Sequence, residues 1–411
     1  MLRRTFLETA ALGVMAFAGG CAHGAVAAAP DTQRLFFTSS GKTCVINADG
    51  SGFRALDFNA PGQVTWQPAG FFPDGRVLLL SMEARRDGPG RPFEEYYHQT
   101  PTHLWIHDPD GGSLAEIADK ERMAPFYTPQ LPLRDNRILV QVVREKPGQI
   151  FNMNLDGTDA RAFTGPGEGL PYGLSLSPDG NRVAFHLAGP DGYQVWTSDT
   201  NGGDRKLLAA HPDFLYFGTS WSPDGQWVAY QACRYRDDPG HDWADLCVGR
   251  PDGSEHRVLT ENQALWFGAT YGNPERRGGG SNIPVWTHDG AVLCSRRLPG
   301  SRVAWAYQAG RPDLDHFNRE FQPETARGGA EICTIHPDTG AVARLTRSEP
   351  PVWDFRACES PDGRLIAFCR CATGEQPALW VMNADGGGQR LLSAELDNTG
   401  ADHPRWVPRA E

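Results

Sequence analysis

Side chains that can exchange protons with a substrate recur in this sequence, both where predicted strands begin and in the long segments between strands. Histidine and tyrosine can accept or donate a proton, and arginine can hold a carboxylate through two parallel hydrogen bonds. The candidates for catalysis are His98, Tyr172, Tyr216, Arg276, Arg356 and His403. The candidates for holding a substrate are Tyr97, Tyr127, His241, Asn282, Arg277, His316 and Arg319.

This combination of residue types suits the cleavage of uronic-acid chains by β-elimination. The reaction needs a cation to neutralise the uronate carboxylate, a base to remove the C5 proton, and an acid to protonate the leaving oxygen. In that reaction the base would be His98 or His403 and the acid Tyr172 or Tyr216, while the cation would come from Arg276, Arg277, Arg319 or Arg356.

The same side chains also suit a non-catalytic surface that binds a glycan or a protein partner. Tyrosine and histidine at strand starts often pack neighbouring sheets, so catalysis requires that they converge within about 3–4 Å of one reacting atom. One divalent metal ion is a further option, because two Asp-His dipeptides offer mixed oxygen and nitrogen ligands. Those metal candidates are Asp315, His316, Asp402 and His403.

A repeated turn organises the rest of the chain. Residues 220–230 contain a Pro-Asp-Gly turn followed by an alternating apolar strand, and the pattern returns at 176–185 and 359–368. The aspartates of this turn and of its looser copies are Asp74, Asp135, Asp179, Asp224, Asp289 and Asp362. The two shortest gaps are 44 and 45 residues, which is the length of one four-stranded propeller blade.

A second turn, usually Asp-Gly, occurs seven times against six full copies of the first. The mismatch resolves if residues 35–58 form the outer three strands of one blade and His403–Pro408 returns as its innermost strand. Closing the ring in this way leaves no open sheet edge. We therefore predict an all-β, seven-bladed β-propeller that spans residues 30–411 as a single domain.

The long segments between predicted strands all fall on one rim of such a ring. They are Glu83–Thr102, Arg234–Asp242, Trp266–Ser281 and Pro299–Gly329, whereas every short turn belongs to the other rim. Long loops on one face of a rigid scaffold commonly carry binding sites. We expect a glycan, or a protein partner, to bind on this face.

The motif Trp-Ser-Pro-Asp-Gly, followed by an apolar strand and an Asp-Gly turn, resembles the TolB-like propeller repeat across nearly the whole chain after residue 29. That repeat occurs in binding proteins, in peptidase-associated propellers and in polysaccharide lyases. A chain of this size also looks like propeller lyases that act on oligogalacturonate or ulvan. It lacks the His-x-His pair of the first group and the Tyr and Arg sixteen residues apart of the second.

The N-terminal segment Met1–Ala29 is predicted to be an export signal. Arg3-Arg4-Thr5-Phe6-Leu7 resembles a twin-arginine motif, and the apolar stretch Ala10–Gly20 is far shorter than the ~18 residues of a membrane span. Ala18–Cys21 resembles a lipoprotein box, so a lipid on Cys21 is the only membrane contact expected. The protein is then periplasmic or at the cell surface.

Charge and cysteine content narrow the remaining options. A net charge of −11 disfavours nucleic acid as a partner, and the absence of a Gly-x-Ser-x-Gly elbow disfavours a serine hydrolase of the propeller-peptidase type. Cys233 ends one predicted strand and Cys247 begins the next, so a disulfide between them is one option. In Cys369-Arg370-Cys371 we expect one buried thiol and one at the surface.

Overall fold

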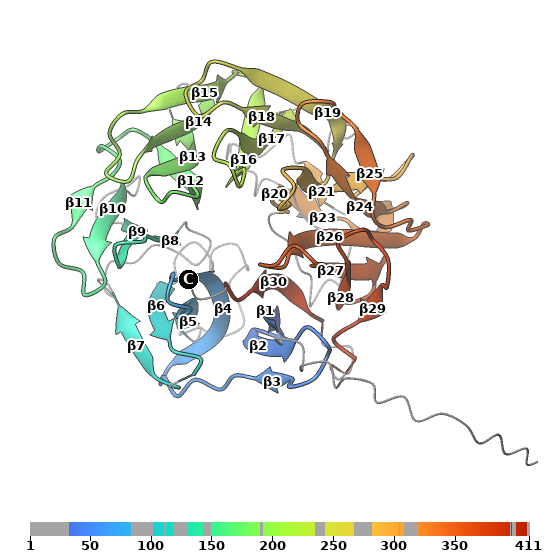
Figure 1. The fold of residues 1–411 in the computed structure, drawn as a ribbon, viewed down its shortest axis with the longest axis horizontal. Coiled ribbons are helices and arrows are strands. Elements are labelled where there is room, and N and C mark those ends of the chain that lie inside the picture. The colour runs from blue at the N-terminus through green and yellow to red at the C-terminus, as the bar shows by residue number, and fades with distance from the viewer. Residues whose placement is uncertain are drawn as a thin grey trace, which may run out of the picture. The chain divides into compact units, whose positions relative to one another are not determined.

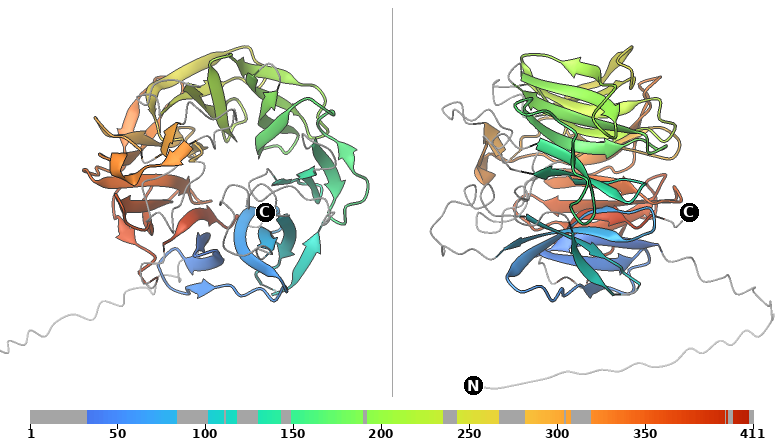
Figure 2. Two further views of the ribbon diagram at one scale, coloured as in Figure 1. Left: turned by 180° about the vertical axis from the view of Figure 1, so that it is seen from behind. Right: turned by 90° about the vertical axis from the view of Figure 1, so that its left-hand side faces the viewer.

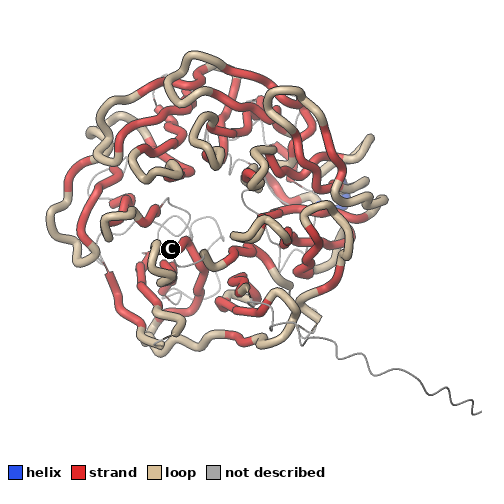
Figure 3. Tube along the Cα trace, viewed as in Figure 1, coloured by secondary structure: helices blue, strands red, loops and turns tan. Residues whose placement is uncertain are grey.

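The computed structural model describes residues 33–83, 102–110, 112–117, 130–142, 149–189, 192–234, 243–266, 282–303, 305–307, 319–394, 396 and 400–408. They belong to one compact unit, Gln33–Glu411, whose described part contains thirty β-strands and one short 3-10 helix, η2 (Pro323–Thr325). The sheets are arranged around a ring (Figure 1), with strands and short loops alternating along it (Figure 3). The expectation of an all-β propeller is confirmed.

Four separate sheets contain four strands each, in the orders β3-β2-β1-β30, β4-β5-β6-β7, β11-β10-β9-β8 and β12-β13-β14-β15. The first is formed by β1 (Arg34–Ser39), β2 (Lys42–Asn47), β3 (Arg54–Ala55) and β30 (Asp402–Trp406). The second is formed by β4 (Gln63–Phe71), β5 (Val77–Glu83), β6 (Thr102–His107) and β7 (Leu114–Ile117). The third is formed by β8 (Gln130–Pro132), β9 (Arg137–Val142), β10 (Gln149–Asn154) and β11 (Arg161–Ala162). The fourth is formed by β12 (Leu170–Leu176), β13 (Arg182–Gly189), β14 (Gly192–Asp199) and β15 (Lys206–Ala210).

The next part of the ring is one twelve-stranded sheet instead of separate blades. Its first six strands are β16 (Phe214–Trp221), β17 (Val228–Arg234), β18 (Ala244–Gly249), β19 (His256–Ala264), β20 (Val285–Trp286) and β21 (Val292–Arg297). Its other strands are β24 (Ala330–Ile335), β25 (Val342–Arg344), β26 (Val352–Glu359), β27 (Leu365–Ala372), β28 (Ala378–Asn383) and β29 (Arg390–Leu391). The described residues thus show four separate four-stranded blades, where seven were expected.

Two single-residue pairings link the parts of this larger sheet. Ala264 of β19 pairs with Arg296 of β21, and Ala330 of β24 pairs in parallel with Trp353 of β26. A separate hairpin of β22 (Trp305–Tyr307) and β23 (Arg319–Phe321) lies in the long segment between β21 and β24. It projects from one face of the ring (Figure 2, right).

The predicted closure by the C-terminal strand is present. β30 pairs antiparallel with β1, so that Leu35 lies opposite Trp406 and Phe36 opposite Arg405. The indole of Trp406 also donates a hydrogen bond of 3.0 Å to the carbonyl of Cys358, in β26. β30 therefore joins the first sheet of the chain to the last, as Figure 1 shows.

The repeated turn is held by its own side chains. Ser222 Oγ donates to the carboxylate of Asp224 at 2.6 Å and accepts the backbone N–H of Trp227 at 2.9 Å, and Ser360 and Asp362 repeat the first contact. Gly225 adopts a φ of 69°, a conformation that costs glycine little. The motif thus fixes each hairpin by local chemistry before any packing.

The hydrophobic core lies between successive sheets. Apolar side chains of β5 and β9, for example, pack together through Leu78, Leu80, Ile138 and Val140, each of them buried. Equivalent clusters fill the other interfaces around the ring, including the one between β1 and β27. A strand buried on both faces needs apolar residues in succession, as the run 77–80 has.

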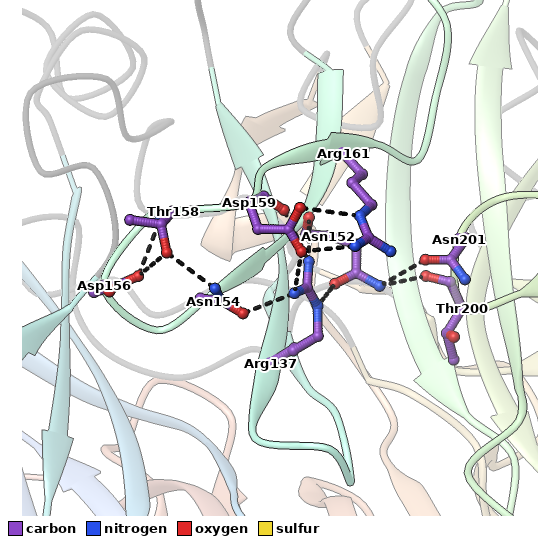
Figure 4. A network of polar contacts seen from close by, with 9 residues as sticks. All are labelled: Arg137, Asn152, Asn154, Asp156, Thr158, Asp159, Arg161, Thr200 and Asn201. Carbon is purple, nitrogen blue, oxygen red and sulfur yellow. Dashed lines mark hydrogen bonds and ion pairs between the residues drawn. The ribbon is translucent and has the colours of Figure 1, made fainter.

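A polar network joins two blades at the rim of short turns (Figure 4). Arg137 donates hydrogen bonds to Asn152 Oδ1 at 2.6 Å and to Asn154 Oδ1 at 2.7 Å, and it pairs with Asp159 at 3.0 Å. Asn152 in turn donates to the carbonyl of Thr200, in the next blade, at 2.9 Å. We call these residues the Arg137 network.

Within the described residues, no helix is both long enough and apolar enough to cross a membrane.

Candidate functional site

Four residues of the inner strands share a left-handed backbone. The strands nearest the centre of the ring include β12, β16, β26 and β30 (Figure 1). In these strands φ is 55° at Gly173, 59° at Gly218, 51° at Arg356 and 54° at His403. Each lies four residues before the position that opens the repeated turn, respectively Ser177, Ser222, Ser360 and Val407.

This shared position is an irregularity of strand pairing. The register shifts between Tyr172 and Ser175 in β12, and between Phe355 and Cys358 in β26. Glycine tolerates the left-handed conformation, whereas a residue with a Cβ atom is strained by about 1–3 kcal/mol. Arg356 and His403 therefore occupy positions where two sister blades carry glycine. Strain of this kind accumulates where function requires a side chain.

Arg356 and His403 meet around Asp402. The Arg356 guanidinium forms an ion pair with Asp402 Oδ2, and its side chain is only 7% exposed. His403 Nδ1 lies 3.6 Å from Asp402 Oδ2, which is too long for a hydrogen bond. The guanidinium of Arg356, from β26, thus lies next to the carboxylate and the imidazole of two neighbouring residues of β30.

Asn282 fastens Arg356 from the neighbouring part of the chain. Its Oδ1 accepts the backbone N–H of Arg356 at 2.7 Å, and its Nδ2 donates to the carbonyl of Leu265 at 2.6 Å. Asn282 is buried, and both groups of its amide are used. We call Asn282, Arg356, Asp402 and His403 the inner-strand cluster.

The protonation state of His403 follows from its surroundings. Burial, together with the positive charge of Arg356, lowers the pKa of His403 from 6.5 to about 4, while Asp402 opposes this shift. The imidazole is therefore neutral at pH 7. Because 29% of the side chain remains exposed, a ligand can reach it. A neutral histidine beside a guanidinium can accept a proton from an anionic substrate.

A second ion pair, between Arg370 and Asp354, joins β27 to β26, the strand that carries Arg356. Arg370, in β27, holds both oxygens of the fully buried Asp354, with Nε at 2.6 Å and Nη2 at 2.8 Å. Ser348 donates a hydrogen bond to the same carboxylate. The guanidinium lies 4.8 Å from the ring centre of Trp380. This bidentate pair fixes β26 two residues before Arg356.

The other predicted site residues are placed differently. Tyr216 lies in the core, 5.9 Å from the Tyr230 ring in an edge-on contact, and burial raises the pKa of Tyr216 to about 12. This environment favours a packing role. Tyr172 and Arg319 lie on β12 and β23, but their side chains fall outside the described ones. His98, Tyr97, Tyr127, His241, Arg276, Arg277, Asp315 and His316 lie outside the described residues.

A metal ion does not fit the residues that are described. Among them, no group of three or more His, Cys, Asp or Glu side chains is placed to bind a metal. Asp402 and His403 would supply two ligands, yet the Asp402 carboxylate already neutralises Arg356. The other two candidates, Asp315 and His316, lie outside the described residues.

Two expectations about the cysteines are wrong. Cys233 lies opposite Ala244 and Cys247 opposite Tyr230, so the strand register keeps the two thiols from facing each other, and the optional disulfide between them does not form. Cys369 and Cys371 are both buried, because residues two apart on a strand point to the same face.

Sequence reasoning missed Arg370 and Ser348. An arginine between two cysteines on a strand suggests a solvent-facing side chain, and only the opposite register position, Asp354, shows its role. The missed signal lay in the repeat itself. Aligning the blades on their turns puts Arg356 and His403 where Gly173 and Gly218 stand.

Comparison with solved structures finds propellers. An oligogalacturonate lyase in complex with manganese is 14% identical, with 87% of this chain and 85% of that chain covered and a TM-score of 0.52. The chain folds as these propellers do. TolB from Acinetobacter baumannii is 15% identical over 91% of this chain and 82% of that one, with a TM-score of 0.44. The likeness to the lyase confirms the expected propeller fold.

A puromycin-hydrolyzing peptidase from Mycobacterium tuberculosis is 12% identical, with a TM-score of 0.54. It covers 93% of this chain, but this chain spans only 53% of the peptidase. No family model matches the sequence, and no curated protein matches it. Identities this low concern the fold alone.

Proposed function

We propose that this protein is a polysaccharide lyase that cleaves uronate-containing glycans by β-elimination at the inner-strand cluster. One observation carries the proposal: a neutral, reachable histidine and a guanidinium meet at strained positions where sister blades carry glycine. β-Elimination needs this pair, because one group removes the C5 proton while the other neutralises the adjacent carboxylate.

In this mechanism the uronate carboxylate binds the Arg356 guanidinium alongside Asp402. The guanidinium then stabilises the charge that develops as His403 removes the C5 proton. The negative substrate also raises the proton affinity of His403, which an isolated pKa of about 4 leaves low. The acid for the leaving oxygen is expected from Tyr172 or from a residue of the long segments, such as His98 or Arg276.

The test is an absorbance assay for the unsaturated uronate product. The protein is mixed with polygalacturonate, alginate, ulvan and a neutral glycan, and the metal content of the same sample is measured. A signal with one acidic glycan, lost in His403→Gln and retained in the Arg137→Lys control at the opposite rim, supports the proposal. No signal with any glycan, from folded protein, rejects lyase activity on these substrates.

A second candidate function is supported by the burial of Arg356. Its guanidinium is 7% exposed and already paired with Asp402, an arrangement that suits a fixed framework better than an exchangeable ligand contact. In that case the protein is a non-catalytic, TolB-like propeller that binds a glycan or a protein partner on the face of the long segments. Titration calorimetry separates the two functions, since it detects binding without product.

The blade count forms part of this proposal. We propose that β16–β19, β20–β25 without the β22–β23 hairpin, and β26–β29 are three blades fused through two single-residue pairings, which gives seven blades in all. Support comes from the hydrophobic clusters, which fill seven successive interfaces between four-stranded units. An experimental structure tests this count. If Ala264 and Arg296 are not paired in it, and Ala330 and Trp353 are not paired either, the ring consists of seven separate sheets.

We further propose that Met1–Ala29 directs export to the periplasm or cell surface. The support is the sequence Arg3-Arg4-Thr5-Phe6-Leu7 before a short apolar stretch. Replacing both arginines with lysine should retain the protein in the cytoplasm. Radiolabelled palmitate incorporation, abolished in Cys21→Ser, tests the lipoprotein alternative.

A further inference from the structure

We propose that Cys294 and Cys333 form a disulfide that fastens β21 to β24 when the chain folds in an oxidising compartment. Their Sγ atoms lie 3.6 Å apart, and both side chains are buried. The two residues lie directly opposite each other in the antiparallel pairing of β21 with β24. The inference rests on the proposed export, because such bonds persist outside the cytoplasm.

The geometry of paired strands suits this bond. Opposite residues in an antiparallel ladder have Cα atoms about 4.5–5.5 Å apart, which falls within the range of about 4.4–6.8 Å found in disulfides. The two sulfurs already face each other, so small rotations about the Cα–Cβ bonds bring them to bonding distance.

The other described cysteines have different strand neighbours. Cys233 lies opposite Ala244, Cys247 opposite Tyr230, and Cys358 opposite Ala367. Cys369 and Cys371 lie opposite Phe355 and Trp353, and Cys44 lies opposite Phe37 and Ala55. Among the cysteines that the structure describes, the register therefore brings only Cys294 and Cys333 face to face.

The reaction is a thiol–disulfide exchange with an oxidising disulfide, such as oxidised glutathione or a disulfide oxidoreductase. The Cys294 thiolate attacks the disulfide and releases one thiol. The Cys333 thiolate then attacks Cys294 Sγ, releases the second thiol and forms the Cys294–Cys333 bond. Two protons leave the protein, and the oxidant is reduced to two thiols. Because both thiols are buried in the native core, the exchange belongs to folding.

The position of the bond gives it a structural consequence. Cys294 and Cys333 flank the segment that contains the β22–β23 hairpin and the candidate residues Asp315, His316 and Arg319. A covalent link at the foot of this segment holds the two strands from which it extends in one register. It also closes a loop of nearly forty residues, which restricts the unfolded chain.

The experiment is oxidative refolding of the purified protein. Reduced, unfolded protein is refolded in a glutathione redox buffer, denatured, alkylated and mapped by mass spectrometry. The expected result is one linked peptide pair containing Cys294 and Cys333, two fewer alkylated cysteines than in reduced protein, and a Tm that falls by about 5 °C on reduction. Cys233→Ser, a matched buried thiol, should keep both properties.

Cys294→Ser should lose the linked peptide and the effect of reductant on Tm, and Cys333→Ala repeats the test if the first variant does not fold. Full alkylation of both cysteines in refolded wild type overturns the proposal, as does a link to another cysteine. A Tm that reductant leaves unchanged overturns the fastening role. Refolding is done in vitro and requires neither export nor lyase activity. Failure of either of those two proposals therefore leaves the result of this experiment unaffected.

Discussion

Arg137 and Arg356 both pair with an aspartate, but they lie in different parts of the ring and in different backbone settings. Arg137, at the turn rim, bonds to two asparagines of β10 and to Asp159 in the turn that follows, and it fastens one blade in place (Figure 4). Arg356 pairs with one carboxylate at a strained backbone position, beside an imidazole that the pairing leaves partly exposed. The Arg137 network also contains a left-handed residue, Asp159 with a φ of 49°, but that residue lies in the exposed turn between β10 and β11, whereas Arg356 and His403 lie in inner strands.

The largest difference between the two regions should appear when their arginines are removed. Arg356→Met removes the guanidinium that neutralises the Asp402 carboxylate and should lower the free energy of unfolding by about 3–5 kcal/mol. Arg137→Met removes the hydrogen bonds to Asn152 and Asn154 and the ion pair with Asp159, and it should lower the free energy of unfolding by about 1–3 kcal/mol. Urea denaturation measures both. The double variant Arg356→Met/Asp402→Asn should recover much of the loss, and failure to recover any would show that the ion pair is not the cause.

The pH dependence of stability should also separate the regions. The pKa of His403 is about 4 in the folded protein and 6.5 normally, so the unfolded chain binds a proton first as the pH falls. The contribution of His403 is complete above pH 6.5 and declines toward pH 4, by at most about 3 kcal/mol. When the free energy of unfolding is measured by denaturation at several pH values across this range, it should change less with pH in His403→Gln than in wild type. An unchanged slope would mean that His403 titrates normally.

The strained position offers a smaller and reciprocal test. His403→Gly removes the left-handed strain and should raise the free energy of unfolding by about 1 kcal/mol while abolishing any activity. Gly218→Ala imposes the strain, with Ile283 only 3.1 Å from the new Cβ, and should cost about 1–2 kcal/mol. If His403→Gly and Gly218→Ala both raise, or both lower, the free energy of unfolding, the two positions are not equivalent.

The smallest effect is expected in the repeated turn. Ser222→Ala removes the hydroxyl that bridges Asp224 and the N–H of Trp227, at a cost of about 1 kcal/mol. Because this turn lies at the scaffold rim, glycan binding or cleavage should remain within error of wild type. Thermal unfolding and the absorbance assay on one preparation check both points.

The local parts of the fold were predictable from the sequence. The Pro-Asp-Gly turns and the alternating strands are encoded within short windows, and the return of 403–408 to the first sheet follows from the mismatch between the two turn counts. The merging of neighbouring sheets was not predictable. It depends on single pairings such as Ala264 with Arg296, which leave no periodic signal in the residues themselves.

The candidate site was predictable in its residue types and less so in their roles. Arg356 and His403 were identified because they open inner strands, and the structure brings them to the same carboxylate. Tyr216 has the same sequence appearance, yet its ring packs in the core. The direction of a side chain at an irregular strand depends on the bulge, and the bulge shows only in the backbone.

Because β30 follows every other strand that the structure describes, Asp402 and His403 are made only after those strands. A nascent chain can stack its earlier blades, but it holds Arg356 without a counter-ion until β30 adds to the edge of β1. Assembly of the site and completion of the fold are therefore a single event. A prematurely terminated product that lacks β30 would therefore lack Asp402 and His403, and under the proposed function we expect it to be inactive.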